Sequence, residues 1–80
     1  MRLPRNLSGA ELIQKLARLG YKPTRQTGSH VRLSCSEPSQ HHITVPQHEA
    51  LRIGTLSAII ADVAAHKKLT REELIARISK

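Results

Sequence analysis

The sequence TGSHVRLSC, residues 27–35, predicts a tight turn followed by a β-strand. Glycine accepts the positive φ angle that a two-residue hairpin turn needs, and serine can hydrogen-bond the local backbone, so Gly28-Ser29 is typical of such a turn. Because side chains alternate along a strand, one face of it is apolar and carries Val31, Leu33 and Cys35. The other face carries His30, Arg32 and Ser34, and it therefore presents an imidazole, a guanidinium and a hydroxyl away from the core.

A helix and an edge strand are predicted before this turn. Ser8-Gly9-Ala10-Glu11 has the spacing of a capping box, so a helix should begin at Ser8. Apolar residues at helical spacing follow, and Gly20 can supply the left-handed residue that ends the helix. Residues 21–26 should form a strand, and Pro23 places it at the edge of a sheet because proline cannot donate to an inner ladder.

Another strand and two helices are predicted after the strand that spans residues 30–36. Residues 41–45 alternate again, with Pro46 expected to end the pairing. Residues 47–54 should be a loop, and Thr55 is expected to cap a second helix that closes at Lys67-Lys68. Thr70-Arg71-Glu72-Glu73 is a second capping box, which should open a short third helix.

The resulting order is α-β-β-β-α plus a short C-terminal helix, which is an α+β fold. Two amphipathic helices and one antiparallel sheet satisfy each other only if both helices cover the same face of the sheet. The other face then stays open, and alternation places on it His30, Arg32, His42 and Thr44. Eighty residues suit one domain spanning 1–80.

The positive charge is concentrated in the half of the chain that carries His30. The chain has 13 Lys and Arg against 6 Asp and Glu, a net charge of +7. Residues 1–36 hold seven basic residues and one acidic residue, so +6 of this charge precedes residue 37. Such a one-sided balance favours a polyanion or an acidic protein as partner, with a merely solvated basic surface as the alternative.

Composition also argues against several other classes of protein. The single cysteine, Cys35, cannot form an internal disulfide, and no apolar run is long enough for a signal peptide or a membrane span, so we expect a cytoplasmic protein without membrane contact. Five histidines raise the question of zinc, but His41 and His42 point to opposite faces and the cysteines of a structural site are missing. The carboxylates are scattered, so neither a metal site nor a cofactor is expected.

Acid–base chemistry by an exposed histidine remains open to this chain. RNA carries its own nucleophile in the 2′-hydroxyl, and histidine, whose ordinary pKa is about 6.5, can serve as base or acid near neutral pH. Lys22, Arg25 and Arg32 would hold the phosphate and stabilise the developing charge. An inert surface histidine is the alternative, because most exposed histidines catalyse nothing. The residues permit a metal-free ribonuclease without requiring one.

The scarcity of aromatic residues narrows the mode of RNA binding. Tyr21 is the single aromatic side chain, whereas sequence-specific readers of single strands stack bases on several rings. A reader of backbone and shape fits better, and the α-β-β-β-α order is that of the double-stranded-RNA-binding domain (dsRBD). DNA binding by the two C-terminal helices is a further alternative, weakened by the acidic Glu72 and Glu73 in the third helix.

Several short blocks of this chain, in order and at similar spacing, resemble the HicA toxins of bacterial HicAB toxin–antitoxin systems. They are Ser8-Gly9 with the following helix, Leu19-Gly20-Tyr21, residues 25–30 (RQTGSH), residues 44–48 (TVPQH) and residues 53–59 (IGTLSAI). The resemblance implies a dsRBD-like fold and an endoribonuclease that cleaves mRNA and blocks translation. It also implies a HicB antitoxin partner, which would occlude the catalytic residue or block RNA access.

The resemblance places the family's catalytic histidine on His30. Ser29 would help to position it, and Lys22, Arg25 and Arg32 would bind phosphate. His42 and His48 are secondary candidates. The rival hypothesis is a non-catalytic RNA-binding module of the same dsRBD-like fold, in which the basic face binds RNA and nothing is cut.

Overall fold

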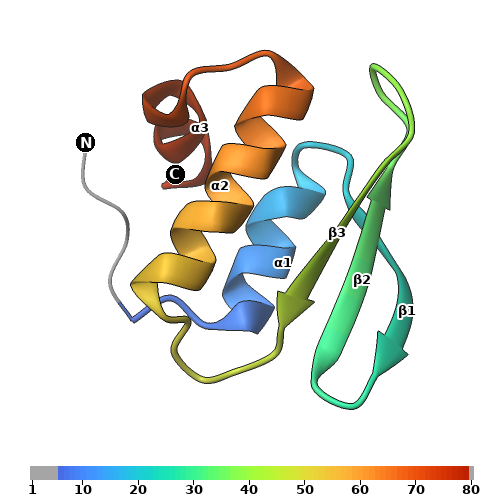
Figure 1. The fold of residues 1–80 in the computed structure, drawn as a ribbon, viewed down its shortest axis with the longest axis vertical. Helices are drawn as coiled ribbons and strands as arrows, with labels where there is room; N and C mark the ends of the chain where they lie inside the picture. Colours follow the sequence, from blue (N-terminus) through green and yellow to red (C-terminus); the bar gives the residue numbers. More distant parts are fainter. Residues whose placement is uncertain (1–5, 80) are drawn as a thin grey trace.

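The computed structural model describes residues 6–79, which form three helices and three strands (Figure 1). In chain order these are α1 (Gly9–Ala17), β1 (Lys22–Thr27), β2 (His30–Cys35), β3 (His41–Pro46), α2 (Ile53–Lys67) and α3 (Arg71–Ile78). The expected α-β-β-β-α order with an additional C-terminal helix is confirmed, and so is the α+β class.

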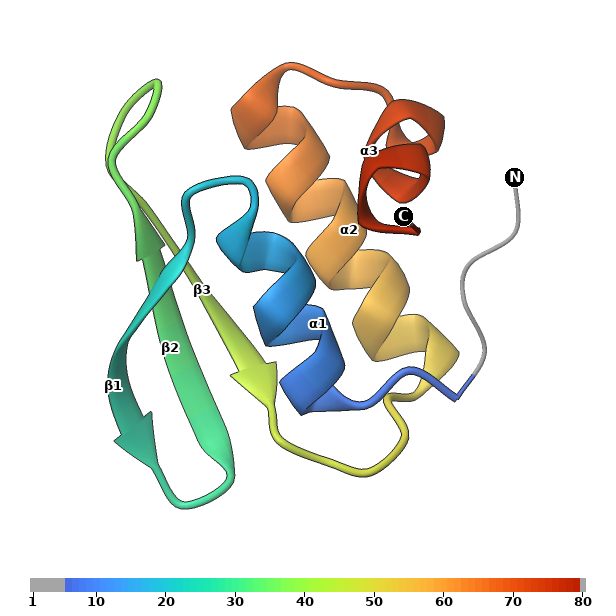
Figure 2. The same ribbon diagram turned by 180° about the vertical axis from the view of Figure 1, so that it is seen from behind.

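The three strands form one antiparallel sheet with β2 in the centre. Seen from both sides in Figures 1 and 2, the helices lie together on one face of this sheet, and the opposite face is uncovered. The burial of β2 alternates as the sequence predicts, because Val31, Leu33 and Cys35 are buried. Their neighbours in the strand point to the uncovered face.

The core lies between the sheet and the helices. The apolar stripe of α2 is buried there as predicted. The third helix completes the core with Leu74, Ile75 and Ile78, and it packs mainly against α2. Within residues 6–79, no helix is both long and apolar enough to cross a membrane.

Both predicted capping boxes are present. The Ser8 hydroxyl accepts from the N–H of Glu11, whose carboxylate accepts from the N–H of Ser8; Thr70 and Glu73 repeat this arrangement at α3. These contacts hold the pKa values of both glutamates below their usual range, because the carboxylates accept backbone hydrogen bonds. Gly20 is in the left-handed region, at φ 92°, as the sequence predicts, but it does not end the helix directly, because α1 ends at Ala17 with Arg18 as its C-cap and a turn follows.

Some predicted boundaries are wrong. The second helix begins at Ile53 with Arg52 as its N-cap, so Thr55 does not cap it and residues 53–54 are not loop. Pro46 does not end the pairing, because it lies opposite His30; β3 is an edge strand and tolerates a residue without an N–H. The first strand extends to Thr27 and the second ends at Cys35, one residue before the predicted end.

Gly9 packs the start of α1 directly against the loop that follows β3. Its N–H donates to the carbonyl of His48 at 2.9 Å. A Cβ atom at this position would lie 2.8 Å from the Cα of Gln47 and would overlap the carbonyl oxygen of Pro46. Only glycine therefore allows this close approach of two backbone segments.

Gly9→Ala is expected to lower the free energy of unfolding by about 1–3 kcal/mol, because the added methyl group meets backbone that cannot rotate away. Urea denaturation measures this loss. Gly54→Ala is the control: nothing lies within 4 Å of its Cβ position in α2, and alanine favours helix, so this variant should be as stable as the wild type or more so. Equal stability of the two variants would contradict the close packing of Gly9.

Candidate active site

The uncovered face of the sheet consists of three cross-strand rows. Residues directly opposite one another in an antiparallel pair share a face, so the register assigns each side chain to its row. In chain order of β1, β2 and β3, the rows are Thr27–His30–Pro46, Arg25–Arg32–Thr44 and Lys22–Ser34–His42. The residues that the sequence places on this face, including His30, Arg32, His42 and Thr44, are therefore together on it.

A β-bulge in the edge strand brings Lys22 and Arg25 to the same face. In a regular strand, residues three apart point to opposite faces. Here the register shifts between Pro23 and Arg25, and Thr24 is the extra residue. The Thr24 hydroxyl lies 3.4 Å from the carbonyl oxygen of Arg32 and 3.3 Å from the Ser34 hydroxyl. The bulge thus adds a cation to this face that alternation alone would have removed.

A shallow hollow of about 290 Å³ lies at the His30 end of this face. It is lined by the side chains of two rows, namely Arg25, Thr27, His30, Arg32 and Thr44. The lining therefore combines two guanidinium groups, two hydroxyls and one imidazole. Guanidinium groups and hydroxyls are the donors that proteins use for phosphate oxygens, and an imidazole can move a proton.

Arg25 and Arg32 stand opposite one another across β1 and β2. Opposite residues have their Cβ atoms about 4.5–5.5 Å apart, and like charges in that arrangement are destabilising. Among residues 6–79, the structure gives neither guanidinium a carboxylate partner. The pair therefore costs folding free energy, and an anion bound between the two groups would relieve the repulsion.

His30 is exposed and is the first residue of β2. In the described part of the chain, neither of its ring nitrogens has a hydrogen-bond partner. The Ser29 hydroxyl is likewise without a partner in residues 6–79, whereas the Ser29 carbonyl accepts from the N–H of Gln47 at 2.6 Å. Both side chains are thus free to meet a ligand, and the turn before them is fixed through its backbone.

His42 shares the face of His30 but lies at the other end of it. It pairs with Ser34, four residues along β2 from His30, a separation of about 13 Å along the strand. Its Nδ1 atom lies 2.6 Å from the Ser34 hydroxyl. His42 therefore belongs to a small hydrogen-bonded group with Ser34 and Thr24 and does not line the hollow of His30.

His48 lies outside the hollow of His30. It lines a second hollow of about 320 Å³ together with Pro46, Leu51, Arg52 and Thr55. This second hollow lies between the end of β3 and the start of α2. Of the two secondary candidates, then, neither shares the immediate surroundings of His30.

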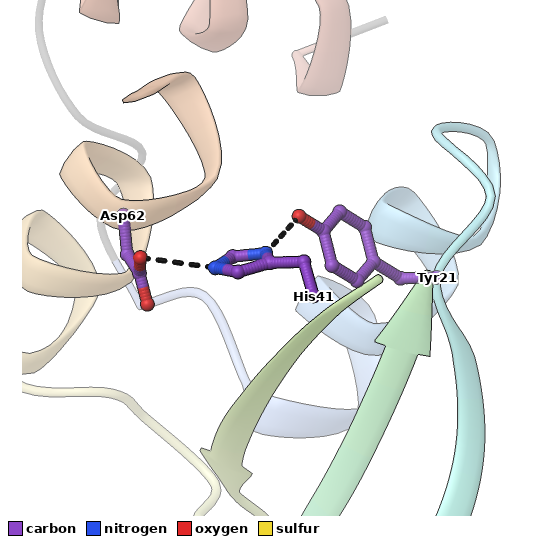
Figure 3. Close-up of polar contacts among 3 residues, drawn as sticks. All are labelled: Tyr21, His41 and Asp62. Atoms are coloured by element: carbon purple, nitrogen blue, oxygen red, sulfur yellow. Dashed lines mark hydrogen bonds and ion pairs between the residues drawn. The ribbon is translucent and has the colours of Figure 1, made fainter. Parts of the chain in front are cut away.

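A polar cluster that the sequence did not reveal lies at the start of β3, away from His30 (Figure 3). The Tyr21 hydroxyl is 2.6 Å from Nδ1 of His41, and Nε2 of His41 is 3.1 Å from a carboxylate oxygen of Asp62. The buried position of Tyr21 raises the pKa of its hydroxyl, with Cys35 and Asp62 adding to the effect. Tyr21 thus keeps its proton and donates to Nδ1, which leaves the Nε2–H of His41 for Asp62.

This cluster connects the sheet to α2. The ring of His66 in α2 stacks on His41 with centroids 4.2 Å apart, and its Nε2 atom is buried without a hydrogen-bond partner. Lys67 donates to the Glu37 carbonyl at 2.7 Å and lies 3.0 Å from Sγ of Cys35, which is buried as predicted. The sequence feature that could have predicted this cluster is a histidine, His41, on a strand face that is otherwise apolar.

No candidate metal centre occurs in residues 6–79, where His, Cys, Asp and Glu side chains form no group of three or more that could hold an ion. His41 and Asp62 are in contact, but both nitrogens of that ring already have partners.

The uncovered sheet face of this α-β-β-β-α domain is cationic, and its rows contain no Phe, Tyr or Trp side chain. The model of the family described as "HicA toxin of bacterial toxin-antitoxin" matches residues 9–64, from α1 into α2. Comparison with curated proteins and with solved structures gave no match.

The chain belongs to the HicA toxin family. Its role is that of a toxin, and membership implies an antitoxin partner and, in general, an RNA target. The third helix lies outside the matched residues, so its contribution to the core is an addition to the part that defines the family.

Arg25→Gln is expected to raise the free energy of unfolding by about 0.2–1 kcal/mol at low ionic strength, because it removes one of two like charges that face each other. The gain should shrink as salt is added. Arg77→Gln in α3 is the control with the same change of charge, and it should lower stability instead, because Arg77 interacts favourably with the Glu73 carboxylate. A loss of stability in Arg25→Gln would contradict the repulsion between the two arginines.

The stability of the fold should decrease above about pH 10, where an ordinary tyrosine ionises. Because the pKa of Tyr21 is raised in the folded state, the unfolded chain ionises first as the pH rises, and ionisation then favours unfolding. Tyr21 is the single tyrosine, so phenolate absorbance should appear together with unfolding and not before it. Tyr21→Phe should flatten this alkaline decline while costing about 1 kcal/mol near neutral pH. Ionisation of Tyr21 while the protein is still folded would contradict the hydrogen-bonded cluster.

Proposed function

We propose that the chain is a metal-independent endoribonuclease that cleaves mRNA and thereby inhibits translation. The observation that carries the proposal is the meeting of His30, Arg25 and Arg32 in one hollow on a face without acidic side chains in its rows. Family membership supports the toxin role and the RNA target.

The chemistry proposed is transesterification at a phosphodiester bond. The 2′-hydroxyl attacks the adjacent phosphorus as it loses its proton, and the 5′-oxygen of the next nucleotide leaves with a proton, giving a 2′,3′-cyclic phosphate and a 5′-hydroxyl end. His30 is the group proposed to move one of these protons, as general base or general acid. The guanidinium groups of Arg25 and Arg32 would hold the phosphate oxygens and stabilise the added charge in the transition state.

The remaining candidates have supporting roles in this proposal. Lys22, two rows from His30, would bind a neighbouring phosphate of the same strand, and Ser29 would help to position His30. His42 and His48 lie outside the hollow and are proposed as secondary contacts only. The cognate HicB antitoxin would silence the toxin by covering His30 or by blocking RNA access to the sheet face.

Wild-type protein is expected to cleave RNA in the presence of EDTA, and His30→Ala to bind the same RNA while cleaving it about 10²–10⁴-fold more slowly. Gel analysis of a labelled transcript measures cleavage, and fluorescence anisotropy measures binding. His42→Ala and His48→Ala should each lose far less activity than His30→Ala.

Three outcomes would count against parts of the proposal. Binding without cleavage by the wild type would indicate the non-catalytic RNA-binding module. Loss of wild-type cleavage in EDTA would refute the metal-free mechanism. Cleavage that persists with saturating HicB would refute the proposed mode of neutralisation.

A further inference from the structure

The turn that precedes His30 is held through both of its backbone carbonyls. The carbonyl oxygen of Gly28 accepts from the side-chain Nε2 of Gln26 at 3.1 Å, and that of Ser29 accepts from the backbone N–H of Gln47 at 2.6 Å. His30 is the next residue along the chain. The groups that fix these two carbonyls therefore also fix the backbone from which the His30 side chain extends.

The two contacts are joined into one closed unit. The Nε2 group of Gln26 also lies 3.2 Å from the side-chain oxygen of Gln47, and an amide nitrogen has two hydrogens, one for each acceptor. Gln47 thus contributes its backbone donor to Ser29 and its side-chain acceptor to Gln26. We call this unit, formed by Gln26, Gln47 and the Gly28-Ser29 turn, the glutamine clamp.

The clamp lies where β3 itself offers the turn no backbone donor. Pro46 is opposite His30 and has no N–H, so the first amide after β3 that can reach the turn is that of Gln47. On the other side, β1 pairs regularly with β2 up to Thr27 opposite His30, but β1 is an edge strand with no further strand beside it. The ladder alone therefore leaves the His30 end of the hairpin weakly fixed relative to β3.

Burial in the core does not account for either glutamine. Both side chains are exposed, and Gln26 points away from the hollow because it pairs with Val31, whereas Arg25 pairs with Arg32. Their side-chain hydrogen bonds go to each other and to the turn. The two exposed amides are 21 residues apart in the sequence, and their hydrogen bonds reach the turn before His30. This arrangement is suited to positioning the His30 side chain.

We propose that Gln26 and Gln47 are positioning residues that hold His30 over the phosphate bound by Arg25 and Arg32. This inference rests on the proposed ribonuclease function. Because a misplacement of about 1 Å can reduce a rate by about 10²-fold, loss of the clamp should lower kcat by about tenfold to a hundredfold. KM should change little, since the two arginines that bind the phosphate are not part of the clamp.

A pair of charge-matched variants separates loss of the clamp from the effect of an added negative charge. Gln26→Glu removes the amide donors and sets a carboxylate against two acceptor oxygens, so it should lower kcat by the stated amount. Gln47→Glu adds the same charge but keeps an acceptor for Gln26 and its own backbone donor, so its kcat should fall much less than that of Gln26→Glu. Gln26→Met keeps the side-chain length without the amide, so it should lower kcat as well. It tests the clamp even if Gln26→Glu unfolds the hairpin.

The experiment measures kcat and KM for RNA cleavage by the wild type, these three variants and Gln40→Ala, an exposed glutamine in the other hairpin turn that should leave kcat unchanged. Hydrogen exchange of the Gln47 amide is measured alongside and should accelerate in Gln26→Glu and Gln26→Met. If the wild type cleaves and Gln26→Glu and Gln26→Met retain its kcat, the clamp is refuted while the ribonuclease stands. If the wild type does not cleave, the proposed function fails and takes the positioning role with it.

Discussion

The pairing of β2 on both of its edges is the constraint on which the rest of the structure depends. As the central strand, β2 is in register with β1 and β3 at once, so its alternation sets the face of every residue beside it. Burial of Val31, Leu33 and Cys35 under the helices fixes that register. A shift by one residue would turn His30 and Arg32 into the core.

The uncovered face carries a conflict between stability and binding. Arg25 and Arg32 repel one another across two strands, and the bulge at Thr24 is the reason that Arg25 faces Arg32 at all. A surface selected only for stability would place a carboxylate opposite one of them. Locally unfavourable arrangements are expected at functional sites, and this one supports an anionic ligand for the face.

The two ends of the sheet have different properties. At the start of β3, the buried Tyr21, the half-buried His41 and the exposed Asp62 connect the sheet to α2 through contacts of 2.6 and 3.1 Å. At the other end, His30 is exposed, and polar contacts between exposed groups hold its turn. The first end connects the sheet to a helix, whereas the second leaves an imidazole accessible to solvent and to a ligand.

The sequence by itself determined the order of elements, both capping boxes, the apolar faces and the exposure of His30 and Arg32, because these follow from local periodicity and from contacts three residues apart. The start of α2 was predicted wrongly at Thr55, since Arg52 begins the helix without a side-chain cap. Only the tertiary structure decided that Lys22 and Arg25 share a face, that His48 lies outside the hollow of His30, and that Gln26 meets Gln47. Each of these depends on register, a bulge or a contact between distant segments, which the packing of the whole chain settles and no local pattern encodes.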